Sequence, residues 1–266
     1  MIVVVTGATR GLGAALAAEL ARRGHTVYGG GRNWAAPASP RPFTALPLDV
    51  TDDASCAAAI NQIVKDHGRL DLLVNNAGIS HCGPIEETPI DRARAVFDTN
   101  YFGPVRMIRA ALPAMRRQGG GTIAIVGSAA GKIGIPFQGH YAASKFAVEG
   151  LAEALWHELR PFGIRVVLIE PGDVGTTIWR DREPAGDNSC YAAALASFVA
   201  VKDLEMGGKA APPERVATEI ADALLSDCSR LRRPVAPGAR FILAARKLLP
   251  DGLFLRLVGR NYRGRG

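Results

Sequence analysis

The chain has 266 residues, of which 48% are hydrophobic and 21% are charged, and its formal net charge at pH 7 is +7. This composition is sufficient for a large buried core and argues against disorder outside the ends. No apolar run is long enough to span a membrane, and the basic residues form no nucleic-acid-binding motif. The four cysteines and five histidines lack disulfide or zinc spacing, so we expect reduced thiols, no metal and a cytoplasmic protein.

A short apolar strand, a glycine-rich turn and a helix open the chain. The start lacks a basic leader and glycines soon interrupt it, so we do not interpret it as a signal peptide. Gly7 permits a tight turn, Gly11 lets the backbone approach a pyrophosphate, and Gly13 lets helix and strand pack closely. The cofactor contacts expected in this turn are Gly7, Thr9, Arg10, Gly11, Leu12 and Gly13.

Strands and helices alternate along the rest of the chain. Further strands are expected at 26–28, 43–48, 70–74, 121–126, 164–169 and 233–236, and helices at 14–23, 54–67, 90–117, 141–160 and 213–225. The strands are apolar throughout, which predicts an α/β fold: a Rossmann-like, doubly wound parallel sheet of about seven strands with helices on both faces. No linker or repeat divides the chain, so residues 1–266 are expected to form a single dinucleotide-binding and catalytic domain.

A tyrosine and a lysine four positions apart are the most informative residues. On a helix Tyr141 and Lys145 lie on the same face, where the ammonium favours the ionised form of the phenol. Ser128 follows the expected strand at 121–126 and so lies at its carboxyl end. Ligands of such sheets bind at that end, so we expect the glycine turn, Ser128, Tyr141 and Lys145 to share one crevice.

These motifs together resemble the short-chain dehydrogenases/reductases, in the compact branch of that family. The resemblance is carried by Thr6-Gly-x-x-x-Gly11-x-Gly13, Asn75-Asn76-Ala77-Gly78, Ser128, Tyr141-x-x-x-Lys145 and Pro171-Gly172. It implies an enzyme that interconverts a ketone or aldehyde and an alcohol, with Tyr141 as acid and base. It also implies that Ser128 binds the substrate oxygen, that Lys145 fixes the nicotinamide ribose, and that Asn100 holds a water in a proton relay. We expect Lys145 and the positive nicotinamide to lower the pKa of Tyr141.

The resemblance also implies further cofactor contacts. Asp49 would meet the adenine ring, although capping the next turn is an equal alternative for this carboxylate. Val174 and Thr176 would bind the nicotinamide carboxamide. The contacts implied beyond the glycine turn are Asp49, Val50, Asn76, Ala77, Gly78, Tyr141, Lys145, Pro171, Gly172, Val174 and Thr176.

The residues after the second strand indicate which cofactor is used. An NAD site places a carboxylate there to bind the ribose hydroxyls, but this chain has three glycines followed by Arg32. Arg32 and Arg10 could bind the 2′-phosphate of NADP, or could be solvated surface charges. We expect NADP(H), with NAD(H) as the alternative.

The substrate contacts are expected from a mostly apolar set. The resemblance implies a substrate lid after Thr176, and residues 177–211, whose patterning is irregular, are expected to form it over a small carbonyl or alcohol substrate. The expected substrate contacts are Ser128, Ile135, Phe137, Tyr141 and Trp179, and Met206 is a further candidate lining residue; the apolar ones among them could equally belong to the core.

The segment 239–266 is longer than a minimal fold of this kind needs and loosely resembles tails of hydroxysteroid and retinol dehydrogenases. It is apolar and basic, with Arg256, Arg260, Arg263 and Arg265 close together. It could contact an anionic membrane surface, cover the substrate mouth or join a partner subunit, and the sequence does not choose among these. The family resemblance implies a homo-dimer or homo-tetramer through the helices that hold Asn100 and Tyr141.

Two other classes of function compete with a redox enzyme. One is a non-redox dehydratase or epimerase of the same fold, which the glycine spacing disfavours. The other is a nucleotide-sensing protein with an inactive site, which the presence of Asn100, Ser128, Tyr141 and Lys145 disfavours. Neither the identity of the substrate nor the direction of reaction follows from the residues.

Overall fold

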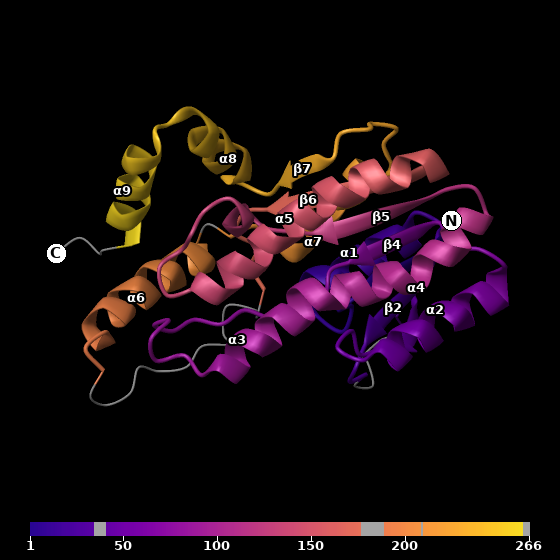
Figure 1. Ribbon diagram of the computed structural model, residues 1–266, viewed down its shortest axis with the longest axis horizontal. Coiled ribbons are helices and arrows are strands. Elements are labelled where there is room, and N and C mark those ends of the chain that lie inside the picture. The colour runs from indigo at the N-terminus through magenta and orange to yellow at the C-terminus, as the bar shows by residue number, and fades with distance from the viewer. Residues whose placement is uncertain (35–40, 177–188, 209, 263–266) are drawn as a thin grey trace.

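A computed structural model describes residues 1–34, 41–176, 189–208 and 210–262. A parallel sheet of seven strands forms its centre, in the order β3-β2-β1-β4-β5-β6-β7 (Figure 1). The strands are β1 (Ile2–Thr6), β2 (Thr26–Gly31), β3 (Thr44–Pro47), β4 (Leu72–Asn75), β5 (Gly121–Val126), β6 (Ile164–Pro171) and β7 (Arg232–Val235). The strand order reverses direction between β1 and β4, and a ligand crevice is expected at such a switch point.

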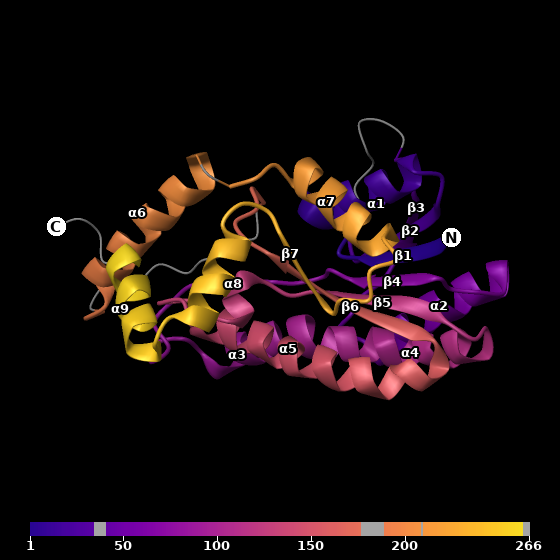
Figure 2. The same cartoon turned by 90° about the horizontal axis from the view of Figure 1, so that it is seen from above.

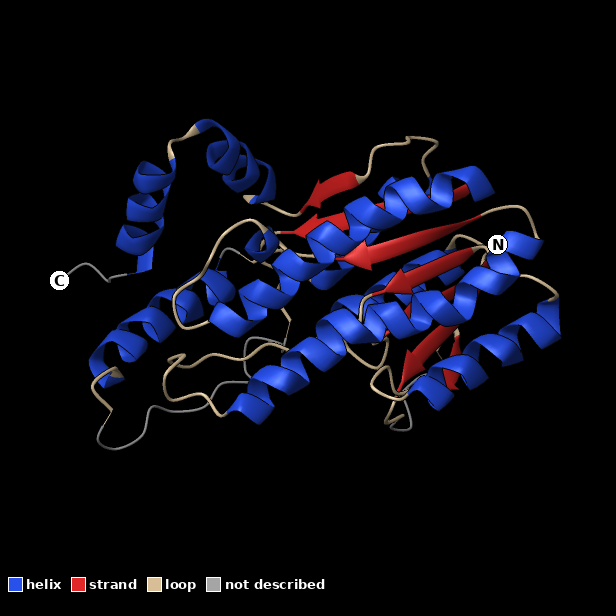
Figure 3. Cartoon of the chain, in the orientation of Figure 1, coloured by secondary structure: helices blue, strands red, loops and turns tan. Residues whose placement is uncertain are grey.

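Helices cover both faces of the sheet (Figure 2). One face carries α1 (Gly11–Arg22) and α7 (Pro213–Leu225), and the other carries α2 (Asp53–His67), α4 (Gly103–Arg117) and α5 (Gly139–Leu159). The remaining long helices, α6 (Ala192–Gly208), α8 (Ala239–Leu248) and α9 (Asp251–Tyr262), gather beyond the carboxyl ends of the strands (Figure 3). The predicted fold class, a doubly wound parallel sheet with helices on both faces, is confirmed.

Burial on both faces explains why the strands are apolar throughout. In β1, Val4 belongs to the core beneath α2, α4 and α5, while Val3 and Val5 belong to the core beneath α1 and α7. All three are fully buried. Burying each such side chain contributes about 1.5–3 kcal/mol. Two hydrophobic cores, one on each face, therefore stabilise the sheet and position the carboxyl ends of its strands.

The helix expected at 90–117 is interrupted. It begins as α3 (Ile90–Phe97), passes through a π-helical turn, η1 (Asp98–Phe102), and continues as α4. Pro104 lies at the start of α4 and has no N–H to give to the carbonyl of Asn100, four residues earlier. The prediction of one regular helix was therefore wrong at this turn, and π-helical turns often occur at functional sites.

The second strand is longer than predicted. It was expected to end at residue 28, but β2 continues through the three glycines that follow. A Cβ atom on Gly29 would lie 2.5 Å from a ring carbon of Phe43, and one on Gly30 would lie 2.4 Å from a methyl carbon of Leu48. Neighbouring side chains fill the space that side chains of this strand would take, so glycines form the strand here.

A buried group of charges joins α5 to β6 and β7. The carboxylate of Glu149 on α5 forms salt bridges with Lys132 at 2.6 Å and with Arg232 at 2.9 Å. Glu170 near the end of β6 is 1% exposed. Burial and the neighbouring Glu149 carboxylate raise the pKa of Glu170 to about 7, while Arg232 and Lys132 lower it in part.

In the described part of the chain, no helix combines the length and apolarity that crossing a membrane requires. Within the same residues, no group of three or more histidines, cysteines and carboxylates is arranged to hold a metal ion.

We predict that Glu170→Gln changes how stability depends on pH. The ordinary pKa of a glutamate is 4.5, so the unfolded chain releases this proton at lower pH than the folded chain, which keeps it up to about pH 7. The free energy of unfolding of the wild type should therefore fall as pH rises through this window, by roughly 1–3 kcal/mol from this group. The glutamine variant should lack that part of the fall in urea titrations at several pH values.

Glu158→Gln is the matched control, because Glu158 is an exposed carboxylate on the same helix as Glu149. It should keep the pH dependence of the wild type. Parallel profiles for Glu170→Gln and the wild type would contradict the assignment.

Candidate active site

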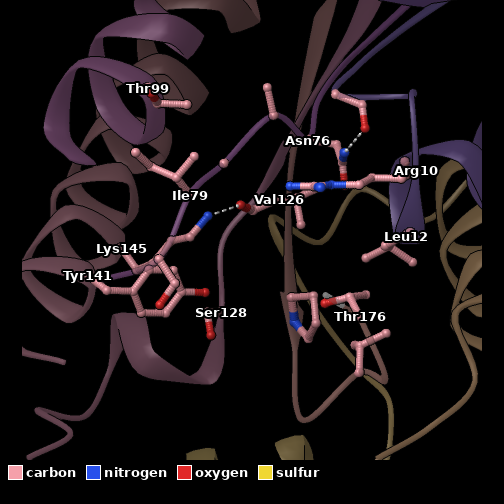
Figure 4. Close-up of a pocket in the computed structure, with 18 of the residues that line it drawn as sticks. Arg10, Leu12, Asn76, Ile79, Thr99, Val126, Ser128, Tyr141, Lys145 and Thr176 are labelled. Atoms are coloured by element: carbon pink, nitrogen blue, oxygen red, sulfur yellow. Dashed lines mark hydrogen bonds between the residues drawn. The ribbon is translucent and has the colours of Figure 1, made fainter. Parts of the chain in front are cut away.

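One cavity opens at the carboxyl ends of the central strands (Figure 4). Its lining includes every residue expected to contact the cofactor, from the glycine turn after β1 to Thr176 after β6. It also includes Ser128, Ile135 and Tyr141 from the expected substrate contacts. Segments far apart in the sequence therefore meet at one site, as predicted, and their individual roles remain proposals.

The glycine turn is shaped by contacts that leave no room for side chains. Gly7 and Gly11 have φ values of +67° and +58°, in the left-handed region that favours glycine. A Cβ atom on Gly13 would lie 2.3 Å from both the carbonyl oxygen of Gly7 and the Nδ2 atom of Asn76. That Nδ2 atom donates to the carbonyl of Thr6 at 2.9 Å. The loop after β4 is thus locked onto the turn, and the first residues of α1 line the cavity.

Asp49 and two arginines also line the cavity. The Oδ1 atom of Asp49 accepts from the amide and the hydroxyl of Thr51, at 3.0 and 2.7 Å. Burial raises the pKa of Asp49, but these bonds and the nearby Arg32 outweigh it and lower the pKa overall. The capping alternative is therefore observed, while contact with adenine remains a prediction. Arg10 and Arg32 are exposed and line the cavity, and Figure 4 shows Arg10 reaching across it.

Lys145 is a buried cation with spare hydrogen-bonding capacity. It is 5% exposed, and its Nζ atom donates to the carbonyl of Val126, at the end of β5, at 2.8 Å. An ammonium can donate three hydrogen bonds, and within the described residues Lys145 donates to this one carbonyl. Burial lowers the pKa of Lys145 to about 8. The remaining donors suit the hydroxyls of a ribose lying in the cavity.

Tyr141 and Ser128 lie at the same end of the cavity (Figure 4). Burial raises the pKa of the Tyr141 phenol, and a hydrogen bond with Ser128 and the charge of Lys202 oppose this shift only in part. The expectation that Lys145 lowers this pKa was wrong for the protein residues alone. The Nζ atom of Lys145 lies 5.8 Å from the centre of the Tyr141 ring, and burial of the phenol outweighs the favourable charges. The predicted effect of the nicotinamide concerns the bound cofactor and stays a prediction.

Asn100 braces the catalytic helix from behind and does not line the cavity. Its Oδ1 atom accepts from the amide of Ile79 at 2.8 Å, and its Nδ2 atom donates to the carbonyl of Ile79 at 2.9 Å. The same Nδ2 atom donates to the hydroxyl of Ser144 at 3.0 Å, and that hydroxyl donates to the carbonyl of Tyr141 at 2.7 Å. Both amide protons of this side chain are used. The backbone carbonyl of Asn100 could hold a relay water, because the residue four positions later, Pro104, has no N–H to give it.

The substrate end of the cavity includes residues that were not predicted from sequence. Gln138 lies one helical turn before Tyr141 and donates to the hydroxyl of Ser80 at 3.2 Å. Lys202 lies four residues before Met206 on α6, so the helical spacing from that predicted residue could have indicated it.

Two of the expected substrate contacts do not line the described cavity. Phe137 packs against Phe198 of α6, with ring centres 5.5 Å apart, so it belongs to the small core that was its alternative. Trp179 lies outside the described residues, as do residues 177–188 and 209 of the expected lid. Residues 192–208 of that stretch, expected to be irregular, form the regular helix α6.

Lys202 holds three segments together above the cavity. Its Nζ atom contacts Asp173, which follows Gly172, at 3.1 Å, and Glu205 at 2.8 Å. It also lies 5.7 Å from the centre of the Tyr262 ring on α9. Burial lowers the pKa of Lys202, but Tyr262, Asp173 and Glu205 outweigh this and raise it. α6 is therefore tied both to the loop after β6 and to the C-terminal helix.

Comparison with known proteins agrees with this geometry. Residues 1–186 match the family model described as short chain dehydrogenase. The chain is 37% identical to the 3-ketodihydrosphingosine reductase of Bacteroides thetaiotaomicron, over 95% of this chain and 94% of that protein. It is 33% identical to the NADPH-dependent 3-dehydrocapnine reductase of Ornithobacterium rhinotracheale, over 98% and 96% of the two chains. The chain therefore belongs to the short-chain dehydrogenase/reductase family, and the predicted resemblance is confirmed.

Solved structures of two family members share the fold. A short chain dehydrogenase from Burkholderia cenocepacia, in complex with NADP, has a TM-score of 0.77 and 28% identity, covering 96% of each chain. One from Burkholderia phymatum, in complex with NAD, has a TM-score of 0.81 and 27% identity, covering 96% of this chain and 94% of that one. Together with the NADPH-dependent relative, these place the chain among oxidoreductases that use a nicotinamide cofactor, without deciding which one.

We predict that Gly13→Ala destabilises the protein and abolishes binding of a nicotinamide cofactor. The added methyl group would lie 2.3 Å from the Gly7 carbonyl and the Asn76 amide, and both belong to the locked turn. Overpacking of this kind typically costs about 1–3 kcal/mol. Thermal unfolding and cofactor titration by fluorescence measure the two effects.

Gly150→Ala is the matched control, because Gly150 is also helical but a Cβ atom there meets nothing within 4 Å. It should raise stability by about 0.5–1 kcal/mol and leave binding unchanged. If both variants behaved alike, close packing at Gly13 would not shape the site.

Proposed function

We propose that the chain is an NADP(H)-dependent oxidoreductase that interconverts a ketone or aldehyde and an alcohol on a largely apolar substrate. One observation carries the proposal: Tyr141, Ser128 and Lys145 meet in the same cavity as the glycine turn. A nucleotide-sensing protein would not require these three side chains. In an oxidoreductase the cofactor carries the hydride, and the tyrosine can exchange the proton that the substrate oxygen gains or loses.

The residues of the chain fit this cofactor. The glycine turn and the first residues of α1 line the cavity, where their backbone amides would bind a pyrophosphate, and Lys145 has donors available for ribose hydroxyls. Val174 and Thr176, after β6, line the cavity where the carboxamide would lie. When bound, the nicotinamide supplies or accepts the hydride.

The roles of the side chains follow from their positions. Ser128 would donate a hydrogen bond to the substrate oxygen and stabilise the charge that develops there. Tyr141 would give its phenolic proton to that oxygen during reduction and take it back during oxidation. Lys145 would bind the nicotinamide ribose, and a water held by the Asn100 carbonyl would return the proton from solvent. The burial that raises the pKa of Tyr141 keeps the phenol protonated and ready to donate, which suits reduction.

The preference for NADP rests on charge. Arg10 and Arg32 line the cofactor end of the cavity, and β2 ends in glycines where an NAD site would carry a carboxylate. Within the described residues Arg32 forms no ion pair, so its guanidinium is available for a 2′-phosphate. The relative from Ornithobacterium is NADPH-dependent by its name, which supports the same choice.

The substrate is proposed to be a ketone of a lipid-like molecule. Ile135 and Met206 provide apolar walls at the Tyr141 end of the cavity. Two relatives that match over nearly their whole length are named as reductases of 3-ketodihydrosphingosine and 3-dehydrocapnine. We therefore take a long-chain ketone as the first substrate to test.

We also propose a cytoplasmic homo-dimer or homo-tetramer that assembles through the helices holding Asn100 and Tyr141. Phe102, at the end of η1, and Phe146, on α5, are 48% and 44% exposed. Exposed aromatic side chains on neighbouring helices suit a subunit interface.

The experiment compares NADPH and NADH consumption with 3-ketodihydrosphingosine as substrate. We predict turnover with both the wild type and Arg32→Gln, and a kcat/KM for NADPH that exceeds that for NADH in the wild type. Loss of the guanidinium should lower kcat/KM for NADPH about 10- to 100-fold, because a charge-assisted bond to phosphate contributes about 1.5–3 kcal/mol. The value for NADH should change little.

Arg22→Gln is the control, because Arg22 is an exposed cation on α1 that pairs with Glu19 away from the cavity. It should leave both cofactors unaffected. Equal losses with NADPH and NADH in Arg32→Gln would contradict the phosphate contact. No consumption of either cofactor with any ketone, while binding is retained, would support a sensor instead.

A further inference from the structure

The C-terminal helices show two different faces. On α9, Phe254 is 5% exposed, and the ring of Tyr262 lies 5.1 Å from that of Phe198 on α6. Asn261 donates to Glu205 of α6 at 3.1 Å. One face of α9 therefore packs inward and covers α6, next to the substrate end of the cavity. These contacts use one face of α9 and leave its other face without a partner among the described residues.

The outer face of α9 alternates leucine and arginine. Leu253, Arg256, Leu257 and Arg260 follow the i, i+3, i+4, i+7 spacing of one helical stripe. The two leucines are 46% and 47% exposed. Neither arginine forms an ion pair with another described residue. This face of α9 therefore presents apolar and cationic side chains side by side.

α8 repeats the pattern. Phe241 and Leu248 are each 78% exposed and lie two turns apart on the helix, beside the exposed cations Arg240 and Lys247. Arg246, in contrast, is turned inward: it pairs with Asp251 and lies 5.2 Å from the centre of the Phe254 ring. Figure 2 shows α8 and α9 together at the end of the molecule that carries α6. We call Phe241, Leu248, Leu253 and Leu257 with their four neighbouring cations the C-terminal face.

Charge decides which partner this face fits. Residues 239–262 contain five arginines and lysines and one aspartate, and Asp251 is already paired with Arg246. A second copy of the same face would bring like charges together, which opposes pairing. An anionic lipid surface suits both kinds of side chain: its acyl chains can bury the leucines, and its negative headgroups attract the cations. The helices have 10 and 12 residues, so they can lie in the interface but not cross it.

We propose that the C-terminal face is a peripheral docking surface for an anionic lipid bilayer. Since α9 also covers α6, docking sets the substrate end of the cavity close to the lipid, where a long-chain ketone dissolves. Only the delivery of a long-chain ketone to the cavity rests on the proposed function. The binding itself is a property of the face, and it is tested without any turnover.

The experiment measures co-sedimentation of the full chain with vesicles of phosphatidylcholine alone or mixed in equal parts with phosphatidylglycerol. The wild type should bind the mixed vesicles, bind phosphatidylcholine vesicles far less, and dissociate as salt is raised. Leu253→Ser with Leu257→Ser should weaken binding by about tenfold or more, because the apolar area is lost. Arg256→Gln with Arg260→Gln should weaken it by roughly tenfold, because each cation near such a surface contributes about 1 kcal/mol.

Two double variants match these changes elsewhere on the surface. Ile85→Ser with Ile90→Ser removes two apolar side chains that are 65% and 64% exposed, and Lys65→Gln with Arg117→Gln removes two charges that lie away from the C-terminal face. Both controls should bind vesicles as the wild type does. Thermal unfolding checks that all variants fold.

Equal binding to neutral and anionic vesicles, or equal losses in the controls, would overturn the proposal. So would a change of oligomeric state in Leu253→Ser with Leu257→Ser, measured by sedimentation velocity without vesicles, since the face would then join subunits. Vesicle binding without ketone turnover would keep this inference and refute the proposed function; turnover of a water-soluble ketone without vesicle binding would do the reverse.

Discussion

Burial of the Lys145 ammonium at the end of β5 is the constraint on which the site depends. A cation that is 5% exposed is costly unless its donors are satisfied, and the protein supplies the Val126 carbonyl. That bond fixes α5 against β5 and so sets the position of Tyr141, one helical turn earlier. The same turn of α5 is also held by hydrogen bonds, from Asn100 to the Ser144 hydroxyl and from that hydroxyl to the Tyr141 carbonyl. The catalytic groups are therefore placed by a strand end, a π-helical turn and one helix, all of them parts of the core.

The cavity is built from two parts with different physical characters. The cofactor part is rigid, because the glycine turn is locked onto the loop after β4 by hydrogen bonds and by the absence of Cβ atoms. The substrate part is closed by α6, which Lys202 ties to Asp173 and which α9 covers. One redox chemistry can therefore be combined with a substrate end whose shape depends on the C-terminal segment, as expected when function lies in sites added to a common fold.

Much of the fold and the cofactor site could be predicted because their signals are local. The glycine turn, the Tyr141 and Lys145 spacing and the strand-helix alternation each depend on a few neighbouring residues. The direction of the Tyr141 pKa shift could not be predicted, because its sign depends on burial that only the packed structure sets. Lys202 and the position of Phe137 were missed for a related reason: both depend on where α6 packs, and no local sequence pattern sets that. The π-helical turn had a local signal in Pro104, whose missing N–H disturbs the preceding turn.

The central claim is that the Tyr141 hydroxyl exchanges a proton with the substrate oxygen while the cofactor exchanges a hydride with its carbon. Single-turnover reduction of a ketone by the Tyr141→Phe variant with NADPH already bound tests it most directly. NADPH should bind as tightly as in the wild type, while the reduction step should slow by about two to four orders of magnitude. A phenylalanine variant that reduces the ketone at the rate of the wild type would show that the proton comes from elsewhere.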